Sequence, residues 1–156
     1  MNSAGPWTTK DFDAMSWHDV HVHGFRLDGY KETEGSADLI LDIDYILKWD
    51  KSGDSFLFTV CRADLRFHEV FGLKLSLDYA TPTAGMTPFS INSIEREVVN
   101  FPAGHQSYKW RVPINWPKGS IEFQAPGFTQ VLTGAPCVQT GRQSLTPQKR
   151  GGGIAA

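Results

Sequence analysis

The sequence predicts an all-β fold: a single antiparallel β-sandwich or open barrel of about eight strands, followed by a disordered C-terminal tail. Apolar and polar residues alternate with a period of two in several separate segments, which is typical of strands. No window of 12 or more residues has the 3.6-residue period of a helix. Clusters of Gly, Pro, Asp, Ser and Thr separate the alternating segments, as in sheets built from short strands.

At 156 residues the chain has the size of one ordinary domain. Its apolar fraction of 40%, with five tryptophans and ten phenylalanines, is sufficient for a core of large rings. We expect a β-domain over residues 12–132 and a flexible, basic, Gly/Pro-rich tail over residues 133–156. That tail has no Asp or Glu but holds three cations, Arg142, Lys149 and Arg150. Such a segment has too few apolar residues to offset the entropy lost when it is ordered.

The expected strands follow one another with turn residues between them. They lie at residues 17–24, 39–49, 56–60, 63–68, 73–79, 89–99, 108–114 and 120–125. Residues 50–54, Asp-Lys-Ser-Gly-Asp, have the composition of a hairpin turn between the second and third of these strands. Residues 80–88 hold two prolines, one glycine and three threonines, which predicts a loop. Pro113 has no N–H for a ladder, so its strand lies at an edge or ends there.

Charge and cysteine content exclude several classes of function. The formal net charge is −2 and the pI about 6.2, so no overall basic field attracts nucleic acid or an acidic membrane. The N-terminal residues show no basic segment followed by an apolar run, and no stretch reaches 18 apolar residues. Two cysteines do not make a disulfide framework. We therefore expect a cytoplasmic protein with neither a nucleic-acid nor a membrane partner.

The most concentrated chemical feature is the run Trp17-His18-Asp19-Val20-His21-Val22-His23-Gly24. On a strand, His21 and His23 share one face with Asp19, and a His-x-His pair can converge on one divalent metal ion. Asp19 is then a third ligand or orients one imidazole. A further donor would come from another strand, from Asp42, Asp44, His68 or His105.

Two other interpretations of the histidines stay open. In the first interpretation, the histidines are structural residues of a central strand, because the same face carries Trp17, Phe25 and Leu27. In the second, His18 or His21 acts as an acid or base, because the pKa of histidine lies near neutrality.

Asp42 and Asp44 form a same-face carboxylate pair on the strand at 39–49. Two such groups can bind a divalent cation or divide acid and base roles, whereas a solvated strand face produces the same spacing without any chemistry. Neither Ser16 nor Cys61 lies in a nucleophile motif. No catalytic residue is therefore assigned from the sequence.

Three segments carry a resemblance: Met15–Asp19, Leu41–Trp49 and Ala63–Val70. They resemble a family of small uncharacterised bacterial β-rich proteins with a Trp-His-Asp start, an "LDIDYI-K-W" strand and a following "A-T-L-V-F-x-N-V" strand. The resemblance covers residues 15–79, and residues 119–132 more loosely, and it brings no established activity. Where the family often has Pro-Ala-Thr-Leu, this chain has Arg-Ala-Asp-Leu at residues 62–65.

More distantly, the size, acidity and strand pattern are similar to those of β-rich immunity proteins from polymorphic toxin systems, each of which binds and blocks one cognate toxin. This resemblance implies a function on an exposed acidic surface. Its contact residues would be Asp42, Asp44, Asp64 and Glu69.

We therefore predict a cytoplasmic binding or interaction module, of immunity type, whose partner is another protein and which needs no cofactor. The alternative is a divalent-metal-dependent hydrolase built on His21 and His23, with a carboxylate from Asp19, Asp42 or Asp44. A third interpretation is a structural subunit that pairs through a sheet edge.

Overall fold

The computed structural model describes residues 5–80, 83, 85–102 and 104–151, and it confirms the all-β prediction. The described residues form ten strands and one short 3-10 helix, η1 (Thr9–Ala14). The strands are β1 (Trp7–Thr8), β2 (His21–Lys31), β3 (Ser36–Ser52), β4 (Ser55–Leu77), β5 (Phe89–Ile91), β6 (Glu95–Asn100), β7 (Gln106–Trp116), β8 (Gly119–Ala125), β9 (Gly127–Leu132) and β10 (Cys137–Thr140).

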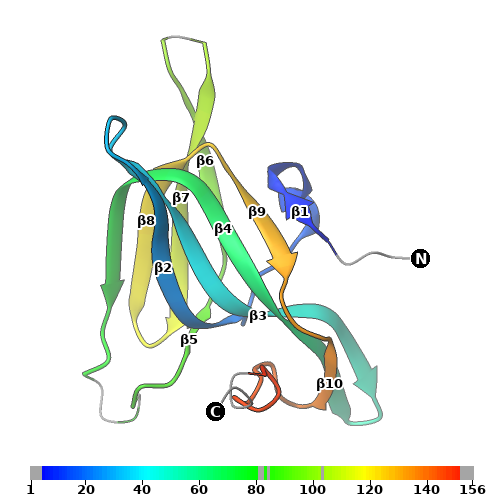
Figure 1. Ribbon diagram of the computed structural model, residues 1–156. Coiled ribbons are helices and arrows are strands. Elements are labelled where there is room, and N and C mark those ends of the chain that lie inside the picture. Colours follow the sequence, from blue (N-terminus) through cyan, green and yellow to red (C-terminus); the bar gives the residue numbers. More distant parts are fainter. Residues whose placement is uncertain (1–4, 81–82, 84, 103, 152–156) are drawn as a thin grey trace.

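Six of these strands pair in a closed ring, in the order β2, β3, β4, β8, β7, β5 and back to β2 (Figure 1). Every pairing in the ring is antiparallel. A sheet that closes on itself is a barrel rather than a two-sheet sandwich. The closure is short, because β5 pairs with β2 only at His21 and Val22.

β4 is 23 residues long and takes part in two regions of the sheet. Its first part pairs with β10 and β9, and its last part pairs with β8. The sequence predicts three shorter strands here, at 56–60, 63–68 and 73–79. In the structure the three segments form one continuous strand. The junction of the last two holds a register shift between Phe71 and Lys74, with Gly72 at φ +65°, and such a bulge bends a strand without ending it.

The core fills the ring with large side chains. The rings of Phe67 and Phe123 lie 4.7 Å apart, and those of Phe67 and Trp110 lie 5.1 Å apart, in edge-to-face arrangements. These side chains belong to one cluster of buried residues that also includes Leu39, Leu41, Ile43, Leu65, Val112, Ile121 and Phe128. The apolar face that the sequence predicts for the 39–49 strand supplies Leu39, Leu41, Ile43 and Tyr45 to this core.

Trp17 lies just before β2 and is buried, with its ring 5.7 Å from that of Phe128. Its indole Nε1 donates a hydrogen bond of 2.8 Å to Oε1 of Gln130, a fully buried residue of β9. The Nε2 atom of Gln130 is buried and has no hydrogen-bond partner among the described residues. The bond from Trp17 is thus the one hydrogen bond that this amide makes with the described residues.

The composition of residues 133–156 predicts a flexible tail; in the structure, the part up to Gly151 lies against the sheet instead (Figure 1). β10 pairs with the first part of β4, and Leu145 packs on Phe58 and Val60 of that strand. Composition does not reveal these contacts, because a few well-placed side chains suffice to hold a short segment. Residues 152–156 lie outside the described residues.

The Trp17–Gln130 hydrogen bond predicts non-additive effects on stability. Trp17→Phe leaves a whole buried amide without a partner, which costs about 1–3 kcal/mol beyond the lost packing. Gln130→Met should be more favourable in the Trp17→Phe background than in the wild type, by about 1 kcal/mol or more, because it removes that unsatisfied amide. Urea unfolding of the four proteins measures the difference, and strict additivity would contradict the assigned role of the bond.

Candidate functional site

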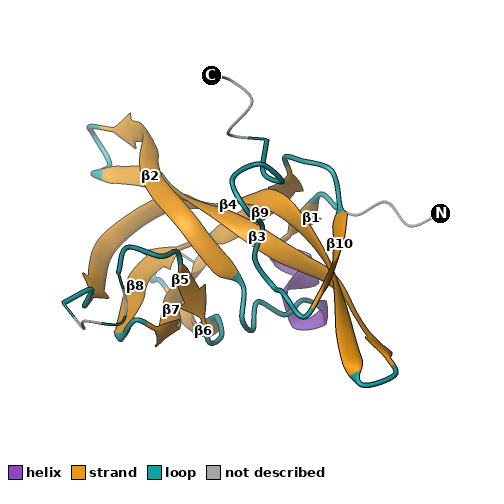
Figure 2. Cartoon of the chain, turned by 90° about the horizontal axis from the view of Figure 1, so that it is seen from below, coloured by secondary structure: helices purple, strands orange, loops and turns teal. Residues whose placement is uncertain are grey.

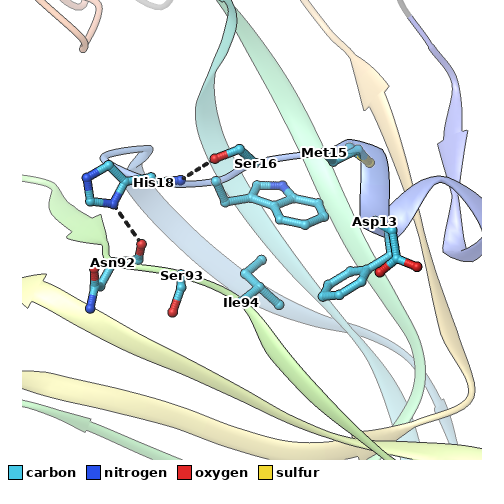
Figure 3. Close-up of a pocket in the computed structure, with 9 residues that line it drawn as sticks. Asp13, Met15, Ser16, His18, Asn92, Ser93 and Ile94 are labelled. Atoms are coloured by element: carbon cyan, nitrogen blue, oxygen red, sulfur yellow. Dashed lines mark hydrogen bonds between the residues drawn. The ribbon is translucent and has the colours of Figure 1, made fainter.

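His18 lines a pocket of about 260 Å³ between the segment that precedes β2 and the segment that follows β5 (Figure 3). Its Nδ1 lies 2.9 Å from the carbonyl oxygen of Asn92, and since a carbonyl only accepts, Nδ1 carries the proton and donates it there. The hydroxyl of Ser16 accepts a 3.4 Å hydrogen bond from the backbone N–H of His18. Ser16 and the His18 imidazole are therefore not joined as a nucleophile and its base would be.

A register shift between Val22 and Gly24 separates the two histidines of the His-x-His motif. His21 stands opposite Asp44 in the β2–β3 ladder, while His23 falls in the bulge and places Nε2 2.7 Å from Asp44 Oδ2. Burial lowers the pKa of His21 and outweighs the Asp44 carboxylate, which raises it. The Nδ1 atom of His21 is buried without a partner among the described residues.

Asp19 has a positive φ of 64°, a conformation that aspartate tolerates better than most residues. Both of its carboxylate oxygens accept hydrogen bonds, one from Asn115 at 2.9 Å and the other from Gln143 at 3.1 Å. Of the three residues expected to bind a metal, Asp19 and His23 are thus held by other partners, while His21 lies near enough to both for their charges to affect its pKa. Within the part of the chain that the structure describes, no three His, Cys, Asp or Glu side chains are grouped as metal ligands.

Asp42 and Asp44 lie at the centre of a network that we call the charge cluster: Asp42, Asp44, Arg62 and Arg150. Arg62 donates two hydrogen bonds of 3.1 Å to Asp42, one to each oxygen. The guanidinium of Arg150, only 6% exposed, bridges Asp42 and Asp44. Asp44 itself has no exposed surface and also accepts the backbone N–H of Leu145 at 2.8 Å.

The charge cluster favours the ionised form of the Asp42 carboxylate. Burial alone would raise the pKa of Asp42, but the hydrogen bonds from Arg62 and Arg150 bring it below its usual value. Asp42 and Asp44 thus lie against arginine side chains rather than on a solvated strand face. The charge cluster anchors the C-terminal segment to β3 through Arg150.

The other two acids expected to contact a partner protein remain partly exposed. Asp64 stands opposite Asp42 in the β3–β4 ladder, and its nearest cation, Arg26, is 3.9 Å away. Glu69 accepts a 2.7 Å hydrogen bond from Lys31 on β2. Asp44 differs from these acids, because Leu145 and Arg150 of the C-terminal segment cover it completely.

The remaining chemically reactive residues have structural partners. The Cys61 thiol donates to the carbonyl of Gly134 at 3.1 Å, and burial raises its pKa, which favours the protonated form. The Nε2 atom of His68 lies 2.7 Å from the hydroxyl of Thr129. The His105 imidazole stacks on Phe101 with 4.9 Å between ring centres.

The sequence suggests a sheet edge at Pro113, but that residue lies in β7, which pairs with β5, β6 and β8, and the open edge is found on β2 instead. From Gly24 to Tyr30, β2 pairs with β3 on one side and with no other strand among the described residues; we call the open side the β2 edge. Figure 2 shows this part of β2 diverging from β5. Phe25 and Leu27 are 47% and 59% exposed, and Tyr30 is 71% exposed.

The exposed apolar residues of β2 face the same side of the sheet as the core. Phe25 and Leu27 stand opposite Leu41 and Leu39, which are fully buried. A groove of about 530 Å³ runs beside β2, with a smaller one of about 260 Å³ further along the strand. Apolar residues that line the two grooves include Phe25, Leu27, Tyr30, Val70, Phe71, Leu73, Leu77, Tyr79, Met86 and Phe89.

Comparisons with known proteins leave the site to be interpreted from its geometry. No protein-family model matches the chain, and no curated protein matches it in sequence. No helix among the described residues is long and apolar enough to cross a membrane.

The charge cluster predicts that Arg150 contributes strongly to stability although it lies near the C-terminus. Arg150→Ala leaves two carboxylates short of a cation, and removal of one partner from a buried ion pair costs about 3 kcal/mol. Arg142→Ala, an exposed cation of the same segment, is the matched control and should change stability by less than about 0.5 kcal/mol. Equal and small losses for both variants in urea unfolding would contradict the anchoring role.

The lowered pKa of His21 predicts a pH dependence of stability. Below about pH 6.5 the unfolded state takes up a proton that folded His21 binds less readily, so the free energy of unfolding falls as the pH decreases. Urea unfolding at pH 7.5 and pH 5.5 should show a smaller loss for His21→Gln than for the wild type. His105→Gln, at an exposed position, should behave like the wild type.

Proposed function

We propose that this chain is a protein-binding module whose β2 edge accepts an extended segment of another polypeptide as an additional strand. The observation that supports the proposal is the unpaired edge of Gly24–Tyr30 beside half-exposed Phe25 and Leu27. An open strand edge offers backbone N–H and C=O groups in a row that a second strand can satisfy.

The grooves beside β2 supply the second element that strand addition requires. In this mode of binding, backbone hydrogen bonds give affinity, and alternate side chains of the added strand enter neighbouring pockets. The grooves of about 530 and 260 Å³ are apolar and adjoin Phe25 and Leu27. An added strand with apolar residues at alternate positions would remove this exposed apolar surface from water.

Two other strands at edges of the described sheet, β1 and β6, favour pairing less. β1 has two residues only. β6 carries Glu95 and Glu97 beside Arg96, and charged side chains are a common means of blocking an open edge. β2 instead combines an open edge with exposed aromatic and aliphatic side chains.

Site-specific photo-crosslinking in the native cell tests this proposal. A photoreactive amino acid at Leu27 or Tyr30 should give a discrete protein adduct, whereas the same group at Val138, 64% exposed on β10, should give none. Phe25→Lys should abolish the adduct formed from position 30, because a charge on the inner face opposes burial of the edge.

Val138→Lys is the control substitution and should leave that adduct unchanged. Adducts of equal yield at all three labelled positions, or none at the β2 positions, would contradict the assignment of β2 as the binding edge.

A further inference from the structure

We infer that the β2 edge pairs with the β2 edge of a second copy of this chain, antiparallel and with Leu27 on the two-fold axis. The inference rests on the proposed function, because it names the strand that the open edge accepts. A two-fold contact uses the same patch on both copies, so the patch must be complementary to itself. The charge pattern of β2 meets this requirement when the axis lies at Leu27.

The parity of the strand limits the registers that are available. When two copies of one strand pair antiparallel about a two-fold axis, residues that stand opposite each other have side chains on the same face of the sheet. Along one strand, residues on the same face are an even number of positions apart, so the axis lies between the two copies of one residue. An axis at Arg26 places the two Arg26 side chains opposite each other, and an axis at Asp28 does the same for Asp28. Like charges directly opposite are destabilising. An axis at Leu27 places each Arg26 opposite Asp28 of the other copy.

Both charged side chains are accessible for such pairing. Arg26 is more than half exposed, and its nearest carboxylate, that of Asp64, is 3.9 Å away. Asp28 is also more than half exposed and lies 3.3 Å from Arg66, whose shorter contact is with Asp38. Two Arg26–Asp28 pairs between copies would therefore add to weak existing contacts rather than break strong ones.

The inner face of the edge is complementary in the same register. Leu27 lies opposite Leu27 of the second copy, and Phe25 lies next to its Gly29, where a register shift between Asp28 and Lys31 and a φ of 64° end the regular pairing of β2. No atom lies within 4 Å of the position a Cβ would take on Gly24 or Gly29. The Phe25 ring can therefore extend over Gly29 across the strand pair, an arrangement that compensates for the missing side chain of glycine.

The expected assembly is a closed dimer. Because each copy uses its one β2 edge, pairing consumes both edges and leaves neither for a third copy. The exposed Phe25 and Leu27 side chains become covered, which accounts for apolar residues on an otherwise open strand.

Charge exchange on β2 tests the inference. By sedimentation or light scattering, the wild type should have twice the chain mass of 17.4 kDa. Arg26→Asp or Asp28→Arg alone puts like charges opposite each other, and either should raise the dimer dissociation constant about tenfold or more. The double variant Arg26→Asp/Asp28→Arg should dimerise again.

A mixture separates interface effects from folding defects. Equal amounts of the Arg26→Asp and Asp28→Arg proteins, each weakly associating alone, should form a heterodimer, since every opposed pair then has opposite charges. Circular dichroism should show that both variants keep the strand content of the wild type. A wild type that stays at 17.4 kDa at its highest soluble concentration overturns the inference, as does a dimer that neither single substitution weakens.

The crosslinking result distinguishes this inference from the proposed function. Adducts from Leu27 that contain a different protein, with a monomeric wild type, would overturn the self-pairing and support strand addition by another partner. A monomeric wild type without any adduct from β2 would overturn both.

Discussion

The pairing between β2 and β5 closes the ring over only two residues, His21 and Val22, and most other features depend on how short it is. On one side of this contact the ring is complete and surrounds an aromatic core. On the other side β2 continues for several residues with one edge unpaired. Side chains whose alternation points them toward the core, Phe25 and Leu27, are consequently half exposed. The same strand thus contributes to the core and presents the open surface.

The charge cluster solves a second problem, which is how a segment poor in apolar residues is held against the sheet. Asp42 and Asp44 would be costly to bury alone, and Arg62 from the neighbouring strand neutralises only part of their charge. Arg150 supplies the missing cation from the C-terminal segment. Compared with apolar side chains in the same place, such an ion pair adds little net stability, because desolvation offsets attraction. Loss of Arg150 alone is costly, because it leaves buried carboxylate charge without its partner, and this dependence holds the segment in place.

The histidine-rich segment comes directly before the open edge of β2 in the chain. Of the histidines that suggest a metal centre, His18 bonds to the carbonyl of Asn92 and His23 bonds to Asp44. His21 is half-buried, and burial lowers its pKa. Along Gly24–Tyr30, by contrast, the backbone of β2 has a strand partner on one side only among the described residues. A surface of that kind recognises another strand by its backbone and by the alternation of its side chains.

The sequence by itself determined the fold class and the apolar face of the 39–49 strand, because period-two alternation depends only on local geometry. It also determined that Asp42 and Asp44 share a face with each other, and that β2 carries Phe25, Arg26, Leu27 and Asp28 in alternation. Only the tertiary structure decided what stands beside those residues. The bulge at His23 and the docking of Arg150 onto Asp42 and Asp44 join residues far apart in the chain. The open edge of β2 likewise follows from strand order, and strand order is set by long-range pairing that no local pattern records.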